Sequence, residues 1–217
     1  MRGRFITLEG GEGGGKSTQA ALLCEALRSR GIAVAATREP GGSPGAEEIR
    51  SLLVQGEAGR WDATAEALLL FAARRDHLER TIRPALAAGS WVVCDRFTDS
   101  TVVYQGVRGL AREVVDELAR IAIGGFSPDL TLILDLPAEI GLERARGRGS
   151  AEDRFERLGL DFHRRLRDSF LEVARREPAR CLVVDATGSV ETVHRRIMAG
   201  VDARLAGAGA GEGSAGR

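Results

Sequence analysis

Short, continuously apolar runs recur along the chain, separated by longer segments that have the spacing of amphipathic helices. Each run holds four to six residues, most of them aliphatic or β-branched. Runs of this kind are typical of strands buried on both faces of a parallel sheet. We therefore expect five strands, at residues 5–8, 32–36, 91–94, 130–135 and 181–185.

Helical spacing of apolar residues fills the intervals between these strands. Pro84 lies inside one such segment and has no backbone N–H to donate, so we expect a kink or a new helix there. Strands that alternate with helices, without an internal repeat, predict a three-layer α/β fold, a five-stranded parallel sheet with helices on both faces. Ligands of such sheets bind beyond the carboxyl ends of the strands. The expected helices lie at about 18–27, 46–54, 64–86, 111–123, from Pro137 onward, about 155–176 and about 190–205.

The length of 217 residues favours a single domain, which we place at residues 1–205. Residues 206–217 are almost all alanine and glycine, and we expect a disordered tail because they can bury little apolar surface. The chain begins directly with a predicted strand, which leaves no room for a signal peptide. No apolar run approaches the roughly 20 residues that cross a bilayer. We therefore expect a cytoplasmic protein without a membrane partner.

The charge balance and the cysteines narrow the possible partners. Acidic and basic residues number 31 each, so no global positive field favours a nucleic-acid partner. Cys24, Cys94 and Cys181 stand singly in apolar runs, without C-x-x-C or metal-ligand spacing. We expect them to be small buried hydrophobic residues.

The strongest motif lies at residues 10–17, Gly-Gly-Glu-Gly-Gly-Gly-Lys-Ser, which matches the phosphate-binding loop G-x-x-x-x-G-K-[ST]. A predicted strand precedes it and a predicted helix follows it, as the motif requires. The glycines let successive backbone N–H groups turn toward anionic oxygens, and the start of the helix adds partial positive charge. The sequence therefore predicts a binding site for a nucleoside triphosphate.

Two side chains of the motif have specific expected roles. Lys16 is the sole lysine among 31 basic residues, and its compact ammonium is suited to reach the β and γ phosphates. Ser17 is expected to hold Mg²⁺. The full set of expected triphosphate-binding residues is Gly10, Gly11, Glu12, Gly13, Gly14, Gly15, Lys16, Ser17 and Thr18.

Several arginines lie near predicted strand ends or on the helices that follow. A guanidinium group holds phosphate through two parallel hydrogen bonds, so these residues could bind a second anion opposite the triphosphate. Arg96 is the strongest candidate because it directly follows a buried strand. Asp95 beside it either joins the Mg²⁺ shell or pairs with an arginine, and the sequence leaves both readings open. The candidates are Arg38, Arg50, Arg74, Arg75 and Arg96.

An arginine-rich segment at about residues 144–156 contains several glycines. We expect a flexible, positively charged lid that closes over the triphosphate and stabilises charge in the transition state. The alternative is a solvated charged loop.

Three stretches together resemble the bacterial type of the thymidylate kinase family, within the P-loop nucleoside monophosphate kinase fold. They are Thr-Arg-Glu-Pro-Gly-Gly at 37–42, Leu-Leu-Phe-Ala-Ala-Arg at 69–74 and Asp-Arg-Phe-Thr-Asp-Ser-Thr-Val-Val-Tyr-Gln-Gly at 95–106. The resemblance extends over about residues 5–203, with support from Pro-Asp-Leu-Thr at 128–131. It implies transfer of the γ-phosphoryl group of ATP to dTMP, which gives dTDP and ADP for dTTP biosynthesis. It also implies Mg²⁺ as cofactor and a homodimer.

The resemblance assigns contacts with the base and the sugar. Phe71 would stack on thymine, and Arg74 would hydrogen-bond its edge. The run from Phe71 to His77 is one residue shorter than is usual in the family, so anchoring on Phe71 selects Arg75 instead. Thr101 and Gln105 would complete the contacts with the base.

The resemblance also assigns contacts with the sugar and the phosphate. Tyr104 would crowd the sugar 2′ position and favour deoxyribose, and Glu12 would approach the 3′-hydroxyl. Asp95 would lie near Mg²⁺. The acceptor phosphate would bind Arg38, Arg50 and Arg96, and Glu39 and Ser100 are counted with the dTMP-binding residues because they lie in the matching stretches.

Catalysis would then rest on alignment and charge, because an acceptor phosphate needs no general base. Lys16, Arg96, Mg²⁺ and the lid would supply the positive charge. Glu12 inside the phosphate loop resembles the subgroup that takes its catalytic arginine from the lid, which selects Arg148 and Arg154. Two alternatives remain: a kinase of another deoxynucleotide or nucleoside, and a regulatory module that binds ATP.

Overall fold

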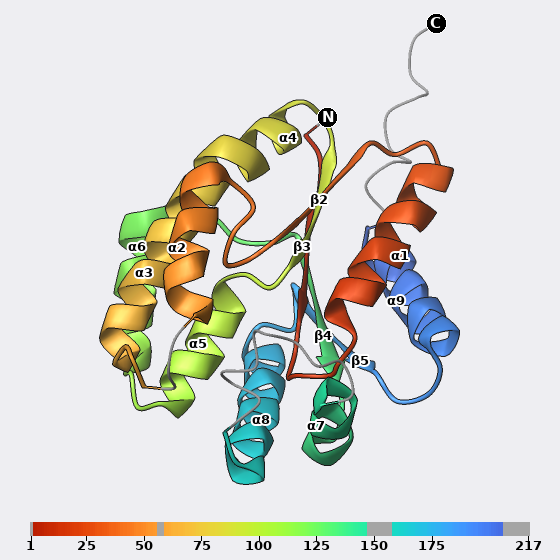
Figure 1. Ribbon diagram of the computed structural model, residues 1–217. Coiled ribbons are helices and arrows are strands. Elements are labelled where there is room, and N and C mark those ends of the chain that lie inside the picture. Colours follow the sequence, from red (N-terminus) through yellow and green to blue (C-terminus); the bar gives the residue numbers. More distant parts are fainter. Residues whose placement is uncertain (1, 56–58, 147–157, 206–217) are drawn as a thin grey trace, which may run out of the picture.

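The computed structural model describes residues 2–55, 59–146 and 158–205 (Figure 1). Five parallel strands form one sheet in the order β2-β3-β1-β4-β5, which confirms the predicted α/β class and strand number. The phosphate-loop motif follows the central strand. The strands are β1 (Phe5–Glu9), β2 (Val34–Arg38), β3 (Trp91–Asp95), β4 (Leu130–Asp135) and β5 (Cys181–Asp185).

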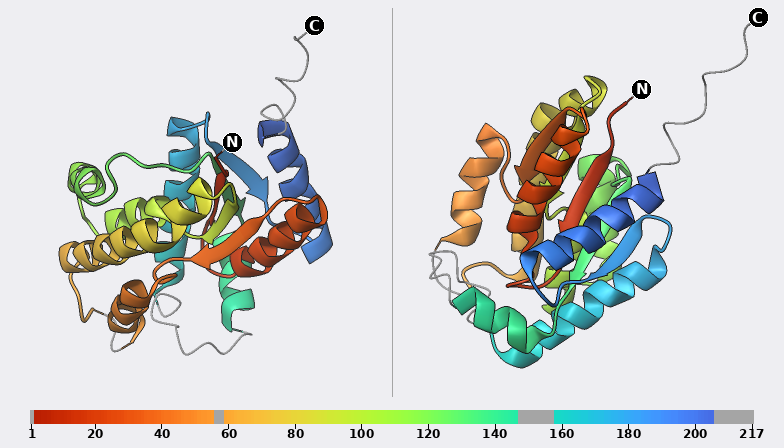
Figure 2. Two further views of the ribbon diagram at one scale, coloured as in Figure 1. Left: turned by 90° about the horizontal axis from the view of Figure 1, so that it is seen from above. Right: turned by 90° about the vertical axis from the view of Figure 1, so that its right-hand side faces the viewer.

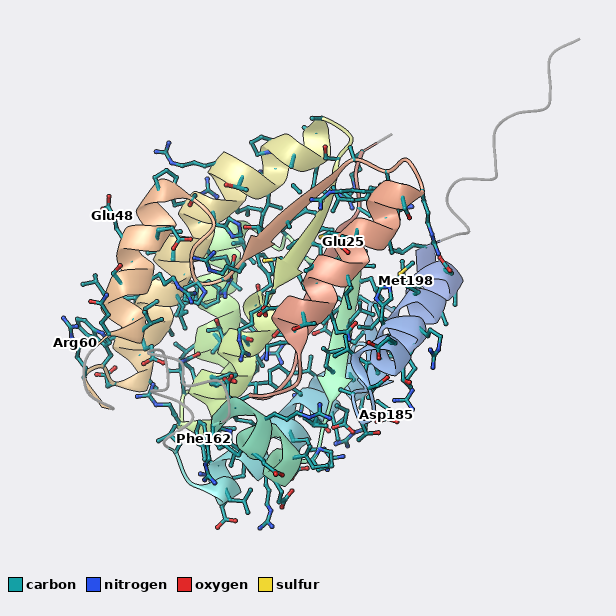
Figure 3. The ribbon with its side chains drawn as sticks, turned by 45° about the vertical axis from the view of Figure 1, so that its right-hand side comes forward. Glu25, Glu48, Arg60, Phe162, Asp185 and Met198 are labelled. Atoms are coloured by element: carbon teal, nitrogen blue, oxygen red, sulfur yellow. The ribbon has the colours of Figure 1, made fainter. Side chains whose placement is uncertain are left out.

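Helices connect the strands and cover both faces of the sheet (Figures 1 and 2). In chain order they are α1 (Lys16–Ser29), α2 (Pro44–Val54), α3 (Ala63–His77), the π-helical turn η1 (Leu78–Ile82), α4 (Arg83–Ala87), α5 (Thr98–Val107), α6 (Arg112–Ile123), α7 (Ala138–Arg146), α8 (Leu160–Arg176) and α9 (Val190–Leu205). One face is covered by α1 and α9, which pack side by side, and α4 and α8 pack on the other. Figure 3 shows Glu25 on α1 and Met198 on α9. Glu25 is exposed, whereas Met198 packs against the core cluster that α1 and α9 share.

The alternation of side chains along β1 explains why both faces are apolar. Successive residues of a strand point to opposite faces. Ile6 and Leu8 are fully buried in the cluster that contains α1 and α9, whereas Phe5 belongs to the cluster on the opposite face. β1 is paired with β3 and β4 along its whole length. Burial on both faces is therefore the physical reason for the continuous apolar runs.

Several observed boundaries depart from the predicted ones. The second strand is Val34–Arg38, two residues later than predicted. The helix α5 was not predicted, because its many β-branched residues give it no clear helical signal. In the segment predicted as one helix with a kink or a new helix at Pro84, the new helix is confirmed, because Pro84 lies in the first turn of α4; the π-helical turn η1 before it was not predicted.

Other expectations concern residues in and around the core. The three cysteines are buried and unpaired, as predicted, and burial raises the pKa of the Cys181 thiol to about 12. Among the described residues, no helix is long and apolar enough to cross a membrane. The described part of the last but one helix begins at Leu160. Residues 147–157, which include most of the expected lid, and the expected tail at 206–217 lie outside the described residues.

Candidate active site

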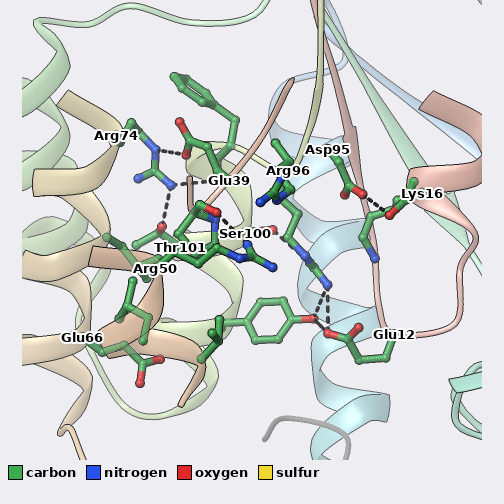
Figure 4. Close-up of a pocket in the computed structure, with 18 of the residues that line it drawn as sticks. Glu12, Lys16, Glu39, Arg50, Glu66, Arg74, Asp95, Arg96, Ser100 and Thr101 are labelled. Carbon is green, nitrogen blue, oxygen red and sulfur yellow. Dashed lines mark hydrogen bonds and ion pairs between the residues drawn. The ribbon is translucent and has the colours of Figure 1, made fainter. Parts of the chain in front are cut away.

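The carboxyl ends of β1, β2 and β3 open into a cavity of about 390 Å³, bounded by α2, α3 and α5 (Figure 4). In Figure 4, Arg74 lies at one end of the cavity, Lys16 lies at the other, and Arg96 lies between them. Most of the predicted site residues meet here: Glu12, Gly13, Gly15, Lys16, Ser17, Arg38, Glu39, Arg50, Arg74, Asp95, Arg96, Ser100, Thr101, Tyr104 and Gln105. The topology thus brings together motifs that are far apart in the sequence.

The phosphate loop connects β1 to α1, and its backbone needs glycine. Gly10, Gly13 and Gly15 have φ values of 133°, 69° and 81°, which side chains other than glycine rarely adopt. The Lys16 ammonium folds back over the loop and donates to the carbonyl oxygens of Gly10 (3.2 Å) and Gly11 (2.8 Å). Burial and the nearby Arg96 charge lower the pKa of Lys16 to about 8.

A second glycine contact joins the loop to α7. A Cβ atom on Gly13 would lie 2.0 Å from the carbonyl oxygen of Gly141, and one on Gly141 would lie 2.4 Å from that of Glu12. Neither residue can carry a side chain unless the backbone moves. The start of the phosphate loop and α7 therefore touch backbone to backbone.

Arg96 connects the phosphate loop to α5. Among the described residues it alone has a positive φ without being glycine, at 70°. Its guanidinium donates to Gly10 O (3.2 Å), Ser100 Oγ (3.1 Å), Glu12 Oε1 (2.8 Å) and the Tyr104 hydroxyl (3.0 Å). The strained backbone aims the side chain back across the cavity, and four acceptors fix its plane.

Glu12 is held as a carboxylate by these neighbours. The Tyr104 hydroxyl donates to Glu12 Oε1 at 2.6 Å, to the same oxygen as Arg96. Burial alone would raise the pKa of Glu12, but the charges of Arg96 and Lys16 and the Tyr104 hydrogen bond outweigh it and hold the pKa at about 2. The cavity therefore contains a fixed negative group close to Tyr104.

Glu9, at the end of β1, fixes the loop that carries Arg96. Its fully buried carboxylate accepts from Phe97 N (2.7 Å) and Ser100 Oγ (2.6 Å). Burial, followed by the charge of Asp99, raises the pKa of Glu9 to about 7. Glu9 was not among the site residues predicted from the sequence, although a carboxylate that ends a buried strand was the same signal that selected Asp95.

Asp95 and Ser17 form the part of the site suited to a metal. Ser17 Oγ donates to Asp95 Oδ2 at 2.5 Å, beside the phosphate loop. One carboxylate and one hydroxyl are the oxygen ligands that Mg²⁺ takes when phosphates and water fill its remaining positions. No group of three or more metal-binding side chains occurs among the described residues, so an all-protein cage is absent from that part of the chain. The residues present fit Mg²⁺ bound together with a nucleotide.

Arg74 is buried at the far end of the cavity and is held rigidly. It donates to Glu39 Oε2 (2.7 Å), to Phe97 O (3.1 Å) and to Thr101 Oγ1 (3.0 Å). The other Glu39 oxygen contacts His77 Nδ1 at 3.0 Å. Arg74 Nη1 has no hydrogen-bond partner in the described part of the chain. One donor of a fixed guanidinium is thus left for a ligand.

Gln105 completes this end of the cavity. Its Nε2 donates to Glu66 Oε1 at 2.8 Å, and Glu66 also pairs with Arg108 at 2.9 Å. A carboxylate only accepts hydrogen bonds, so the amide nitrogen must face Glu66. The amide oxygen of Gln105 has no partner among the described residues. The described residues that line the cavity therefore include one free acceptor, on Gln105, and one free donor, on Arg74.

The remaining arginines differ in their placement. Arg50 lines the cavity and donates to Pro40 O at 2.6 Å. Arg38 lies at its rim and donates to Glu47 at 3.1 Å. Arg75 is on the outer side of α3, where it donates to Ala122 O and pairs with Glu79. Of the two arginines that the sequence left open, the structure brings Arg74 to the cavity.

Other candidates stand apart from the cavity. Phe71 is 2% exposed and does not line it, and the place on α3 that faces the cavity is taken by Leu70. Gly10, Gly11, Gly14 and Thr18 shape the phosphate loop and the first turn of α1. Arg148 and Arg154 lie outside the described residues. Glu66 and Leu70 were not selected from the sequence: Glu66 lies outside the stretches that carry the resemblance, and Leu70 lies within the stretch 69–74 but was given no role there.

Comparisons with known proteins agree with this geometry. The family model described as thymidylate kinase matches residues 8–197. A thymidylate kinase of Caulobacter vibrioides is 56% identical over 205 residues, which cover 94% of this chain and 98% of that protein. One of Rhodopseudomonas palustris is 53% identical and covers 94% and 90%. The crystal structure of thymidylate kinase from Ehrlichia chaffeensis superposes with a TM-score of 0.74 at 33% identity, covering 93% of this chain and 99% of that one.

Proposed function

Because this chain belongs to the thymidylate kinase family, a family of ATP-dependent nucleoside monophosphate kinases, we propose that it transfers the γ-phosphoryl group of ATP to dTMP. The products are dTDP and ADP, and the reaction is a step toward dTTP.

The observation that carries the proposal is that two residues lining the cavity, Arg74 and Gln105, each have one unpartnered polar atom. Arg74 Nη1 is a donor and Gln105 Oε1 is an acceptor. The pairing edge of thymine offers the complementary groups, the O4 acceptor and the N3–H donor. Cytosine presents an N4 donor and an N3 acceptor, so both of its groups would oppose those of the protein. An unpaired buried polar group costs about 1–3 kcal/mol, so this edge discriminates between the two bases.

The opposite end of the cavity suits the phosphates. The backbone of the phosphate loop and Lys16 hold the triphosphate, as in other loops of this kind. Arg38, Arg50 and Arg96 bind the acceptor phosphate from the facing side. Between the two ends, Tyr104 and Glu12 take the sugar, with Tyr104 against the 2′ position and Glu12 near the 3′-hydroxyl. Thr101 and Ser100 border the base and the phosphate.

The transfer requires little covalent work from the protein. An oxygen of the acceptor phosphate attacks the γ-phosphorus, a new P–O bond forms, and the bond to the β-phosphate oxygen breaks, so that ADP leaves. Lys16 and Arg96 stabilise the negative charge that spreads over the equatorial oxygens. The hydrogen bonds that Arg96 donates to four acceptors keep its guanidinium oriented before the substrate arrives, so little reorganisation is needed.

Mg²⁺ would be held by Ser17 and Asp95, and when bound it neutralises phosphate charge. The Ser17 hydroxyl now donates to Asp95, which keeps both oxygens beside the loop. Arg148 and Arg154 are proposed to supply the catalytic arginine of the lid.

We also propose that the protein is cytoplasmic and that it forms a homodimer. Leu68, Val114 and Ile121 are large apolar side chains with exposed fractions of 53%, 39% and 65%. They lie on α3 and α6, which pack against each other. Light scattering coupled to size-exclusion chromatography tests the assembly: a mass close to twice 23.2 kDa supports the dimer, and a monomer mass at micromolar concentration refutes it.

The direct test of function is ADP release with ATP, Mg²⁺ and each of dTMP, dUMP, dCMP, dGMP and thymidine as acceptor. We expect a strong preference for dTMP over dCMP. Arg74→Gln should raise the KM for dTMP roughly tenfold or more and narrow the preference over dCMP. Arg75→Gln, one residue away on the outer side of the helix, is the matched control and should change neither. Preference for dCMP or thymidine would refute the acceptor assignment, and ATP binding without transfer to any acceptor would favour a regulatory module.

A further inference from the structure

Three residues of α3 form a stripe along the wall of the cavity. Glu66, Leu70 and Arg74 are spaced by four positions, so they lie on the same face of the helix, and all three line the cavity. Figure 4 shows Glu66 and Arg74 on the same side of it. Phe71 is rotated by one residue from this stripe. The helix thus presents Leu70 to the cavity, between the residue that holds Gln105 and the arginine that contacts the base.

Phe71 has a different place, behind Arg74. Its ring centroid is 4.8 Å from the Arg74 Cζ atom, and the Phe97 ring lies 5.2 Å from the same atom. Both rings therefore lie within cation–π distance of the guanidinium. With 2% of its surface exposed, Phe71 is part of the support of Arg74 and offers no face to a ligand.

We propose that Leu70, and not Phe71, is the apolar surface against which the base of the acceptor nucleotide packs. The inference rests on the proposed function. A base whose edge meets Arg74 and Gln105 has its plane next to the side chain that lies between Glu66 and Arg74 on the stripe. Leu53 and Val54 of α2 line the same cavity, so apolar side chains from two helices border the base. An aliphatic side chain supplies dispersion and burial but no ring stacking.

Because the proposed platform is aliphatic, an aromatic residue at position 70 is expected to increase the affinity for dTMP. An aromatic ring stacks on a base more favourably than an aliphatic chain contacts it, so Leu70→Phe should tighten dTMP binding. Leu70→Ala should weaken it roughly tenfold, because apolar contact area is lost. Phe71→Leu should lower the melting temperature, but it should weaken dTMP binding less than Leu70→Ala does.

The experiment is isothermal titration of dTMP into the wild type and the three variants, followed by KM and kcat with saturating ATP. Val190→Ala removes an apolar side chain that is 46% exposed on α9, away from the cavity and from the proposed dimer face, and should bind dTMP as the wild type does. We expect the change at position 70 to appear in the Kd and KM for dTMP, with the KM for ATP and the kcat within about twofold of the wild type.

Two results would overturn the inference. If Phe71→Leu weakens dTMP more than Leu70→Ala does, the ring is the platform. If both variants at position 70 bind dTMP like the wild type, the base does not lie on Leu70. The proposed function would still stand in that case, provided that the wild type phosphorylates dTMP. A wild type that neither binds nor phosphorylates dTMP rejects both proposals.

Discussion

The Glu9 carboxylate makes the stability of this protein depend on pH in a direction that is uncommon for a glutamate. Its pKa is raised from 4.5 to about 7, first by burial and then by the Asp99 charge. The folded state therefore holds a proton that the unfolded chain releases near pH 4.5. The stability linked to this proton is fully present below pH 4.5 and is lost as the pH rises through 7. Replacing Glu9 with glutamine keeps the size and removes the ionisation.

The size of the effect follows from the pKa. Each pH unit between the unfolded and folded values is worth about 1.4 kcal/mol, so ionised Glu9 costs on the order of 3 kcal/mol above pH 7. Between pH 5 and pH 8 the wild type should lose about 2 kcal/mol relative to Glu9→Gln. Glutamine can still accept from Phe97 N, the hydrogen bond that Glu9 receives at 2.7 Å, so the loop that carries Arg96 keeps its anchor.

The assay is urea unfolding of the wild type and Glu9→Gln, followed by circular dichroism at pH 5, 6, 7 and 8. The difference in the free energy of unfolding should move in favour of the variant as the pH rises. Glu117→Gln is the control, because Glu117 is exposed and the hydrogen bond from Arg120 lowers its pKa; that variant should gain nothing at high pH. A difference between Glu9→Gln and the wild type that stays constant from pH 5 to pH 8 would refute the reasoning.

Three other substitutions test separate parts of the site and the fold. Arg96→Lys replaces a guanidinium that donates to four acceptors by a single ammonium. It should lower kcat/KM for dTMP roughly 100-fold and leave the affinity for ATP unchanged in equilibrium titration. Equal losses for both nucleotides would contradict this role. Gly141→Ala places a methyl 2.4 Å from the Glu12 carbonyl oxygen, and should raise the KM for ATP severalfold because α7 must move off the phosphate loop; an unchanged KM would show that the contact is not needed. Asp99→Asn breaks the buried pair with Arg180, which is held at 2.7 Å by two hydrogen bonds, and should cost about 3 kcal/mol in urea unfolding; a loss below about 1 kcal/mol would mean that the pair is not structurally important.

The sheet could be predicted from the sequence because burial on both faces leaves a continuous apolar run, and the phosphate loop because its chemistry needs fixed residue types. Helix α5 could not, because Thr98–Val107 is rich in β-branched residues and packing against α8 and α3 decides its conformation. A similar limit applied to the second strand, where Ile32 and Ala33 are apolar but precede the observed strand. Local pattern identifies buried segments better than it identifies their ends.

The site was predictable at the level of motifs but not of single side chains. The short run from Phe71 to His77 left the choice between Arg74 and Arg75 open. The choice depends on which of the two side chains α3 turns toward the cavity. Arg74 is the one, and its hydrogen bonds to Glu39 and Thr101 hold it there. The same signal that selected Asp95, a carboxylate at the end of a buried strand, could have selected Glu9. Its role comes from backbone groups of a loop some 90 positions away, which no local pattern reveals.

The single lysine of the chain gives the site a built-in chemical reporter. Lys16 is 7% exposed, and burial with the Arg96 charge lowers its pKa to about 8, so far more of it is an unprotonated nucleophile at neutral pH than for an ordinary lysine. An amine-selective acylating reagent has this one side chain as its target. Bound triphosphate would cover the amine, and its negative charge would favour the protonated form, so less label would be attached. The yield of the labelled peptide in mass spectrometry would therefore measure occupancy of the phosphate loop without any enzymatic assay.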